Sequence, residues 1–252
     1  MFKSMLSALA VAALAFVAMP ALSRADEPPA LSPKQEAAVK KLIHDYLLEN
    51  PHIVMEAVDA LREKERVAAE MRAKKILNDR KDKIFNDPES PVLGNPKGDV
   101  TIVEFFDYRC QYCKAMLNTL FETVKTDGKV RLVMKELPIL GPESVLASRA
   151  AIASRPQKKY GEFHLALMRY NGALTEPAIM RIASGVGISV ERLKKDMEAP
   201  EIGKIIDDDI ELAHDLDFSG TPGFIVGSQL VPGAMSGPAL RQLIAEARKP
   251  KS

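Results

Sequence analysis

Apolar residues recur with helical spacing near the start of the chain. They fill the i, i+3, i+4, i+7 and i+8 positions of one helix face: Val39, Leu42, Ile43, Tyr46 and Leu47. Ser32, Pro33 and Gln35 are the cap, the first-turn proline and the capping-box partner that typically open a helix. Asn50-Pro51 repeats the cap-and-proline signal and predicts a second helix, which becomes mostly charged over residues 62–83.

The apolar face of residues 39–61 is too large to stay exposed on a tail. It can be buried against the same segment of another copy, or it can pack back on its own domain. We favour the first arrangement, an oligomerisation stalk. The charged residues 62–83 would then form a solvated helical spacer, although a plain surface helix fits the same pattern.

A different pattern begins after a turn-rich segment. Residues 86–98 are dense in Pro, Gly, Asn and Asp and mark a domain boundary, with Val92-Leu93 as a short edge strand. The apolar runs 100–106 and 130–136 are typical of strands, and the run 115–124 between them has helical spacing. A strand–helix–strand order predicts a parallel pair of strands joined by a crossover helix.

The rest of the chain returns to helical patterns before the sheet resumes. Residues 142–218 read as a series of helices, which we interpret as a helical insertion. Residues 224–226 and 229–231 are short apolar runs separated by Gly227-Ser228, and this predicts a hairpin. Ser236 and Pro238 then open a last helix.

Composition and the first residues bear on location. The chain has 35 Lys and Arg against 34 Asp and Glu, so no basic excess indicates a nucleic acid partner. Residues 1–25 combine Lys3, a long apolar run and Ser23-Arg24-Ala25, which is typical of a signal peptide cleaved before Asp26. A membrane anchor is the alternative, but Pro20 interrupts the apolar run. We therefore expect export to an oxidising compartment.

The only two cysteines, Cys110 and Cys113, follow the predicted strand 100–106 and stand at the start of the predicted helix. The first turn of a helix has unpaired N–H groups and a partial positive charge, and both stabilise a thiolate. A Cys-x-x-Cys pair at a strand-to-helix junction is typical of a redox motif. We therefore expect thiol–disulfide exchange.

Other uses of the cysteine pair fit the sequence less well. Zinc needs about four ligands, and the chain adds only four scattered histidines: His44, His52, His164 and His214. A purely structural bridge over so short a loop would stabilise little. A Cu(I) site at Cys110 and Cys113 suits two soft thiolates and stays open as an alternative. We expect His164 and His214 to be surface residues of helices.

Three local features resemble the DsbA-like periplasmic oxidoreductases. Phe105-Phe106 lead into Cys110-Gln111-Tyr112-Cys113, Glu104 stands six residues before Cys110, and Gly220-Thr221-Pro222 precede the predicted hairpin. Within that family, the chain resembles the group of the suppressor of copper sensitivity protein C, which has an N-terminal helical extension. The resemblance covers about residues 91–249, with a weaker similarity over residues 32–86.

The resemblance implies a fold and a domain order. The fold is α/β, a thioredoxin fold with a DsbA-like helical insertion at about 142–218, preceded by an N-terminal helical oligomerisation extension. The domains would be a signal peptide (1–25), the extension (26–88) and a thioredoxin-like catalytic domain (89–252). Because the family includes trimers, we expect a homotrimer formed through residues 32–61.

It also implies roles for individual residues. Cys110 would be the attacking thiolate and Cys113 the resolving thiol. Glu104 would be a buried acid that exchanges a proton with Cys113. Thr221 and a cis Pro222 would pair with the substrate beside the cysteines. Gln111 and Tyr112, which differ from the more usual Pro-His or Pro-Tyr, would contact substrate and affect the redox potential.

Our leading hypothesis is a periplasmic thiol–disulfide interchange enzyme that isomerises or reduces misbridged exported proteins. A dithiol oxidase of the DsbA type is one alternative, and a Cu(I)-binding protein of copper tolerance is another. We expect no cofactor apart from the redox-active disulfide Cys110–Cys113. The expected partners are unfolded or misbridged exported proteins and a membrane-bound thiol reductase or oxidase.

Overall fold

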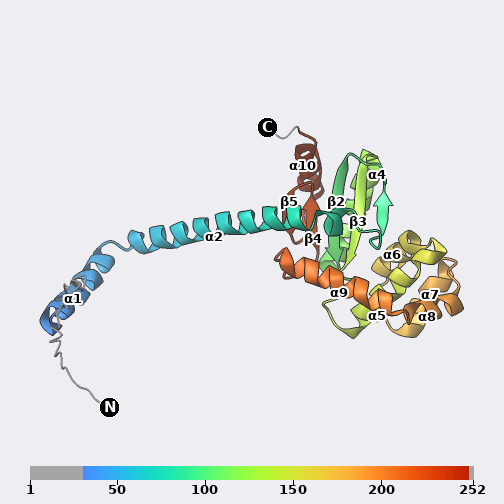
Figure 1. The fold of residues 1–252 in the computed structure, drawn as a ribbon, viewed down its shortest axis with the longest axis horizontal. Helices are drawn as coiled ribbons and strands as arrows, with labels where there is room; N and C mark the ends of the chain where they lie inside the picture. Colours follow the sequence, from blue (N-terminus) through green and yellow to red (C-terminus); the bar gives the residue numbers. More distant parts are fainter. Residues whose placement is uncertain (1–30, 250–252) are drawn as a thin grey trace, which may run out of the picture. The chain divides into compact units, whose positions relative to one another are not determined.

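The computed structural model describes residues 31–249 (Figure 1). The expected signal peptide, residues 1–25, lies outside the described residues. The chain divides into two compact units between Arg62 and Glu63.

The first unit holds α1 (Pro33–Glu49) and the start of α2 (His52–Asp79). The predicted capping box is present, because the Gln35 amide donates to Ser32 Oγ at 3.4 Å and the Ser32 amide donates to Gln35 Oε1 at 3.0 Å. No residue of α1 is buried, and Leu42 is 68% exposed. The predicted apolar face therefore exists, and it is open to solvent within the described residues.

A five-stranded mixed sheet forms the centre of the second unit. Its order is β1-β3-β2-β4-β5, with these bounds: β1 (Val92–Gly94), β2 (Val100–Phe106), β3 (Val130–Glu136), β4 (Gly223–Val226) and β5 (Gln229–Pro232). As the strand–helix–strand pattern predicted, β2 and β3 are parallel, and the other pairs are antiparallel. The hairpin of β4 and β5 was also predicted.

Helices cover both faces of this sheet. One core contains Ile102 and Phe106 of β2 and is covered by α4 (Gln111–Asp127), α6 (Tyr160–Arg169) and α10 (Gly237–Ala247). The other core contains Val103 and Phe105 with Leu212 of α9 (Pro200–Asp215) and Ile84 of α3 (Lys81–Phe85). Successive residues of β2 point to opposite faces, so the strand is buried on both sides.

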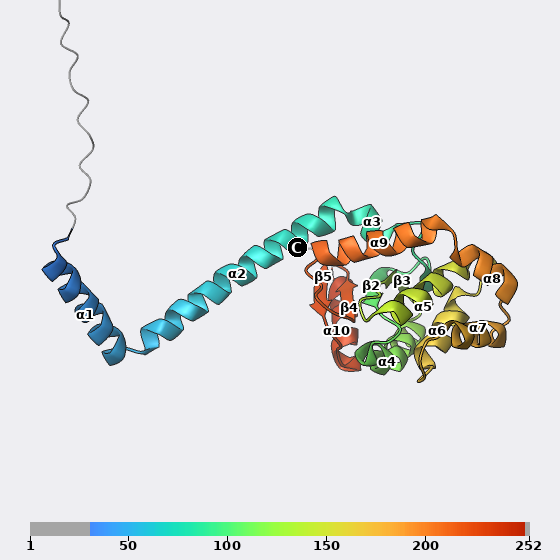
Figure 2. The same ribbon diagram turned by 90° about the horizontal axis from the view of Figure 1, so that it is seen from below.

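The helical insertion completes the unit. It comprises α5 (Pro142–Ala153), the 3-10 helix η1 (Arg155–Gln157), α6, α7 (Glu176–Gly185), α8 (Val190–Met197) and α9. Figure 2 shows α6, α7 and α8 gathered at one end of the sheet, whereas α9 lies along one of its faces. This is the predicted thioredoxin fold with an insertion at about 142–218.

The charged run 62–83 is mostly exposed, but its end packs on the rest of the second unit. Leu77 and Ile84 are buried, and the Arg80 guanidinium pairs with the carboxylates of Asp215 and Glu211 on α9. By packing, residues 63–88 thus lie with the sheet, although the sequence assigns them to the extension.

A buried ion pair fastens α9 to the sheet. Lys135 Nζ lies 2.9 Å from Asp209 Oδ1, and both side chains are almost completely buried. The second oxygen of Asp209 accepts a hydrogen bond from the Glu136 amide at 3.0 Å. Burying a charge is costly unless it is paired and hydrogen-bonded, and here both conditions are met.

Candidate active site

The two cysteines lie where β2 passes into α4. The helix begins at Gln111, four residues before the apolar run that predicted it, because Cys110 itself is the N-cap. The Cys113 amide donates to Cys110 Sγ at 3.3 Å. Cys110 is 5% exposed and Cys113 1%. The less buried sulfur is therefore the one at the helix N-terminus, as the sequence predicted.

The Thr221-Pro222 segment lies directly beside Cys110. The peptide bond between the two residues is cis, which confirms the prediction. The Cys110 thiol donates to the Thr221 carbonyl oxygen at 3.2 Å. The contact arises because β4, which starts at Gly223, runs antiparallel to β2 and pairs Gly223 with Phe105. Residues more than a hundred positions apart thus form one surface.

Hydrogen bonds to the Cys110 sulfur favour its ionised form. The Cys113 thiol is the strongest donor, followed by the Thr221 side chain and the amides of Cys113 and Tyr112, and together they lower the pKa of Cys110 to about 6 despite its partial burial. The Thr221 carbonyl favours the protonated sulfur, but these donors outweigh it. At neutral pH the Cys110 sulfur is therefore mostly a thiolate.

The same arrangement acts on Cys113 in the opposite direction. Because its thiol proton is donated to Cys110, and because the side chain is buried, the pKa of Cys113 is raised well above its ordinary value. The nearby Glu104 charge raises it further. The pair therefore consists of one ionised and one protonated sulfur.

Glu104 is buried in the middle of β2, between Met134 on β3 and Phe224 on β4. Its side chain is only 2% exposed, so the predicted burial is confirmed. Desolvation raises the pKa of Glu104 to about 8, and repulsion from the Cys110 charge adds to this. A carboxyl with a pKa near neutral can both give and take a proton.

The predicted substrate residues differ in exposure. Tyr112 is 70% exposed and Gln111 is also exposed on the first turn of α4, whereas Thr221 is half-buried and Pro222 buried. Gln111 and Tyr112 follow Cys110 on the first turn of α4, and the Thr221 carbonyl contacts the Cys110 sulfur. Their contacts with a substrate stay a prediction.

Sequence reasoning missed Asp107, which holds the loop before Cys110. One of its carboxylate oxygens accepts from the Arg109 amide at 2.7 Å and the Ser144 hydroxyl at 2.7 Å, and the other accepts from the Leu140 amide at 3.0 Å. The only signal was an acidic residue directly after a buried strand. Asp107 therefore joins the cysteine loop to the segment between β3 and α5.

The prediction that His164 is a surface residue was wrong, whereas His214 is indeed exposed. His164 is completely buried, with Nδ1 3.1 Å from the Tyr108 hydroxyl. It shares a helix face with Tyr160, Phe163 and Leu167, at spacings i, i+3, i+4 and i+7. This spacing could have placed it in the core.

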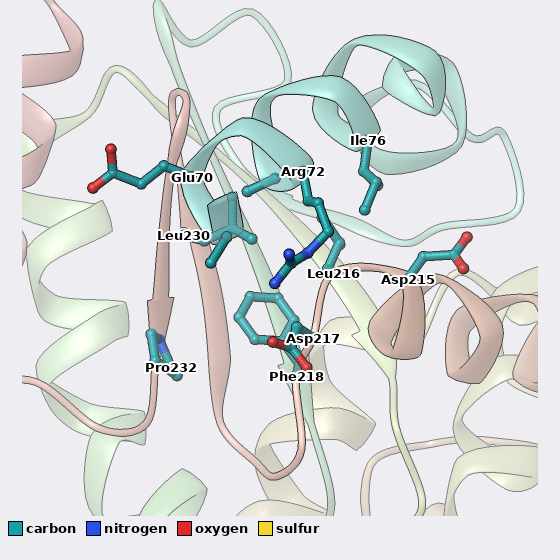
Figure 3. Close-up of a pocket in the computed structure, with 11 residues that line it drawn as sticks. Glu70, Arg72, Ile76, Asp215, Leu216, Asp217, Phe218, Leu230 and Pro232 are labelled. Atoms are coloured by element: carbon teal, nitrogen blue, oxygen red, sulfur yellow. The ribbon is translucent and has the colours of Figure 1, made fainter. Parts of the chain in front are cut away.

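A separate pocket of about 280 Å³ lies between α2 and the end of α9 with the β4–β5 hairpin (Figure 3). In Figure 3 the Arg72 and Ile76 side chains extend from α2 towards Leu216 and Phe218. The lining is largely apolar and contains neither cysteine. The chemistry of the dithiol therefore takes place elsewhere, at the N-terminus of α4.

Metal clusters and membrane spans are both absent from residues 31–249. Within them, no three His, Cys, Asp or Glu side chains are grouped so that they could hold a metal ion. Nor does any helix there have the length and apolar character required to cross a bilayer.

The fold and the dithiol together define a class. A Cys-x-x-Cys pair at a helix N-terminus, facing a cis-proline, on this mixed sheet is the arrangement of thioredoxin-fold thiol–disulfide oxidoreductases. The model of the DSBA-like thioredoxin domain matches residues 101–245, and the chain belongs to this family. A second model, the copper resistance protein ScsC N-terminal domain, matches residues 35–68.

Solved structures agree with this assignment. A thioredoxin-like oxidoreductase from Silicibacter pomeroyi DSS-3 is 49% identical with a TM-score of 0.66, and the match covers 68% of this chain and 98% of that one. A linker-deletion mutant of Proteus mirabilis ScsC is 26% identical with a TM-score of 0.66, and the match covers 88% and 98%. The second match thus extends well beyond the residues that the DSBA-like model covers.

Curated relatives include the probable disulfide bond formation protein D of Bacillus anthracis, 29% identical over 62% of this chain and 79% of the relative. Na(+)/H(+) antiporters such as NhaA 3 of Salinispora tropica also match, at 26% identity over 61% of this chain. The chain spans about a quarter of the length of these antiporters (24%).

Proposed function

We propose that this protein is an exported thiol–disulfide interchange enzyme that isomerises or reduces misbridged proteins. The proposal rests on the state and position of the Cys110 sulfur. This sulfur is ionised near neutral pH, and it lies 3.2 Å from the Thr221 carbonyl oxygen, next to a cis-proline. The redox-active groups are Cys110 and Cys113, with no further cofactor.

The first step is attack of the Cys110 thiolate on one sulfur of a substrate disulfide. A bond forms between Cys110 and that sulfur, the substrate's S–S bond breaks, and the other substrate sulfur leaves as a thiolate. In this proposal the backbone at Thr221, beside Cys110, holds the substrate as an added strand. Gln111 and Tyr112 contact it from the first turn of α4.

The mixed disulfide then has two fates. In isomerisation, another substrate thiolate attacks the substrate's sulfur and releases Cys110. In reduction, Cys113 loses its proton, attacks Cys110 and forms the Cys110–Cys113 disulfide, while the substrate leaves as a dithiol. Glu104 accepts the Cys113 proton in this direction and returns it when the protein disulfide is reduced, since the pKa of Glu104 is about 8.

Two observations favour isomerase or reductase over oxidase. The apolar face of α1 is exposed, with Leu42 at 68% and Ile43 at 53%, and the ScsC N-terminal model matches this region. We propose that residues 32–61 form a homotrimer, which would place several dithiols around one cleft. Thr221 before the cis-proline also resembles the isomerase and reductase members of the family.

The cellular setting follows from the first residues. The expected cleaved signal peptide of residues 1–25 leads to a periplasmic location. There a membrane-bound thiol reductase would keep Cys110 and Cys113 reduced for isomerisation, whereas a membrane-bound oxidase would keep them as a disulfide for oxidation. The identity of this membrane-bound partner decides whether electrons pass into the Cys110–Cys113 pair or out of it.

The test is refolding of a protein with scrambled disulfides, compared with oxidation of a fully reduced one. We expect the reduced enzyme to restore the native bridges of the scrambled substrate, and Cys110→Ala to abolish this activity. Faster action on the reduced substrate than on the scrambled one would favour the DsbA-type oxidase. Unchanged refolding by Cys110→Ala would disprove the exchange mechanism.

Copper binding is the rival of another class, and the name of the matched N-terminal model gives it a specific basis. Cys110 and Cys113 are the only thiols available as soft ligands. Titration of the reduced chain with Cu(I) decides the matter. Very tight binding that needs both thiols, together with absence of exchange activity, would replace our proposal.

A further inference from the structure

A second buried carboxyl lies behind the loop that leads into Cys110, and the exchange reaction above does not use it. Glu136 is the last residue of β3 and is 1% exposed. Its carboxyl contacts three hydroxyl groups: Ser148 at 2.7 Å, Tyr160 at 3.0 Å and Tyr108 at 3.3 Å. Three hydroxyl donors on one buried carboxyl form a hydrogen-bond network, in which the position of one proton affects the other hydrogen bonds.

The three hydroxyls come from three different parts of the unit. Tyr108 belongs to the loop between β2 and α4, two residues before Cys110, whereas Ser148 is on α5 and Tyr160 on α6. Glu136 therefore joins the helical insertion to the cysteine loop. The neighbouring Asp107 carboxylate does the same through Ser144, one turn before Ser148 on α5.

His164 extends this network. Its Nδ1 lies 3.1 Å from the Tyr108 hydroxyl, while its Nε2 is buried and has no hydrogen-bond partner within residues 31–249. The ring packs edge-on against Phe106 at 4.8 Å and stacks on Tyr160 at 5.8 Å. Desolvation lowers the pKa of His164 to about 3, so the ring is neutral and carries one N–H.

The protons in this network can be counted. The Tyr108 hydroxyl has one hydrogen, which can be donated to Glu136 or to His164 but not to both. When Glu136 is a carboxylate, it accepts from all three hydroxyls, so His164 Nδ1–H must donate to the Tyr108 oxygen. When Glu136 is protonated, Tyr108 is free to donate to Nδ1, and the ring hydrogen moves to Nε2.

We propose that Glu136 is a positioning residue for the cysteine loop, and that Tyr108 and His164 form a relay whose hydrogen bonds reverse when the Glu136 carboxyl changes its protonation state. The ionised form places a negative charge beside Tyr108, two residues before Cys110 in the chain. Like charges disfavour one another, so the Cys110 thiolate, which forms at lower pH, disfavours ionisation of Glu136. This consequence, unlike the relay itself, rests on the proposed function of Cys110.

The groups around Glu136 place the ionisation of its carboxyl at neutral to alkaline pH. Burial raises the pKa of Glu136 to about 8, with Asp209 adding to the rise and the three hydroxyls opposing it. The other groups around the network are Tyr108, Tyr160, His164, Glu104 and the Lys135–Asp209 pair. Lys135 points to the opposite face of β3, where Asp209 neutralises it.

The first test reads the relay directly. In the full chain with isotopically labelled imidazole nitrogens, the His164 signals are followed by NMR as the pH rises through 8. We expect the hydrogen to move from Nε2 to Nδ1 as Glu136 ionises, with the ring neutral throughout. Glu136→Gln and Tyr108→Phe should each abolish this switch, because one lacks the titrating group and the other lacks the bridging hydroxyl.

The second test reads the coupling to the cysteine loop through the same His164 signals. Cys110→Ala should shift the His164 switch to lower pH, because the thiolate that disfavours ionisation of Glu136 is removed. Glu162→Gln, a change at an exposed position on α6, is the control and should leave the switch at the same pH. Near-ultraviolet circular dichroism establishes that each variant is folded.

Each outcome has a definite meaning. A His164 tautomer that stays the same across the titration in the unsubstituted chain, or a switch that persists in Glu136→Gln, overturns the relay. A switch that stays at the same pH in Cys110→Ala overturns the coupling of Glu136 to the cysteine loop. Should Glu136→Gln fail to fold, the unsubstituted chain and Tyr108→Phe decide. The His164 readout needs no exchange activity, so failure of the proposed function remains distinguishable.

Discussion

At the scale of single residues, the Cys110 sulfur is distinguished by the donors that converge on it. The Cys113 thiol, the Thr221 side chain and the amides at the start of α4 all stabilise the negative charge. A fall of the pKa from 9 to about 6 makes the thiolate the main form at neutral pH. Because a thiolate is the nucleophile in disulfide exchange, this ionisation links the helix N-terminus to the reaction.

We predict that the thiolate absorbance of the reduced protein appears with a midpoint near pH 6, the value that these hydrogen bonds support. Cys113→Ala should raise this midpoint, since the strongest donor is lost. Cys110→Ala should show no inflection in this range. A sulfur that remains protonated up to about pH 8 would contradict the whole account of the site.

Glu104 makes stability depend on pH. Its pKa is about 8 in the folded chain and 4.5 as an ordinary carboxyl, so folding keeps a proton that the unfolded chain releases. The associated stability is present in full below pH 4.5 and is lost as the pH rises through 8. A shift of this size corresponds to about 3–5 kcal/mol.

We therefore predict that Glu104→Gln unfolds at higher urea concentration than the unsubstituted chain above pH 8, but not at pH 5. The amide keeps the shape of the protonated acid and cannot ionise. Glu122→Gln, on an exposed position of α4, is the control and should show no such pH dependence. Parallel stability curves for Glu104→Gln and the unsubstituted chain would show that Glu104 is not protonated in the native state.

At the scale of the elements, α9 and β3 are held together by charge as well as by apolar contacts. Lys135 is 1% exposed and depends on Asp209 for neutralisation, with Asp87 Oδ2 further away at 3.6 Å. A buried pair of this kind is costly to break, because the remaining charge loses its close partner. The pair thus determines where the helical insertion returns to the sheet.

Asp209→Ala is predicted to destabilise the unit by about 3–5 kcal/mol, because it leaves the buried Lys135 ammonium with only the more distant Asp87 carboxylate, at 3.6 Å, as a partner. Asp207→Ala, two residues earlier on the same helix and exposed, should change the unfolding free energy by less than about 0.5 kcal/mol. Urea unfolding of both variants provides the comparison. Equal effects would mean that the buried pair contributes nothing beyond a surface charge.

At the scale of the whole molecule, the two compact units differ in what they present. The first presents an exposed apolar helix face, and the second contains the dithiol. Apolar surface of this extent tends to be covered by a partner, and the capping box makes α1 a well-defined helix by itself. Assembly and chemistry should therefore be separable.

We predict that residues 26–252 form a trimer in solution and that deletion of residues 32–61 gives a monomer, as measured by light scattering. The Cys110 titration should be the same in both, because the hydrogen bonds that lower its pKa come from Cys113, Tyr112 and Thr221. Refolding of scrambled proteins should decline in the monomer. If the full chain is itself monomeric, the proposal that residues 32–61 form an oligomerisation stalk is wrong.

The amino-acid sequence by itself determined the local features. Caps such as Ser32, the helical spacing around Leu42 and the position of Cys110 at a helix start all depend on interactions within a few residues, so their signals are short-range. The parallel pair of strands was predicted from the strand–helix–strand order. Even the cis Pro222 was predicted, but through family resemblance rather than through its neighbours in the chain.

Only the tertiary structure decided which distant groups meet. Alternation could not show where Glu104 points, because β2 is buried on both faces. The contact of Cys110 with Thr221, the pairing of Lys135 with Asp209, and the network of Glu136, Tyr108 and His164 join elements far apart in the chain. Such contacts depend on strand order and helix packing, which carry no local signature. His164 is different, because its spacing on α6 indicated the core although we expected it at the surface.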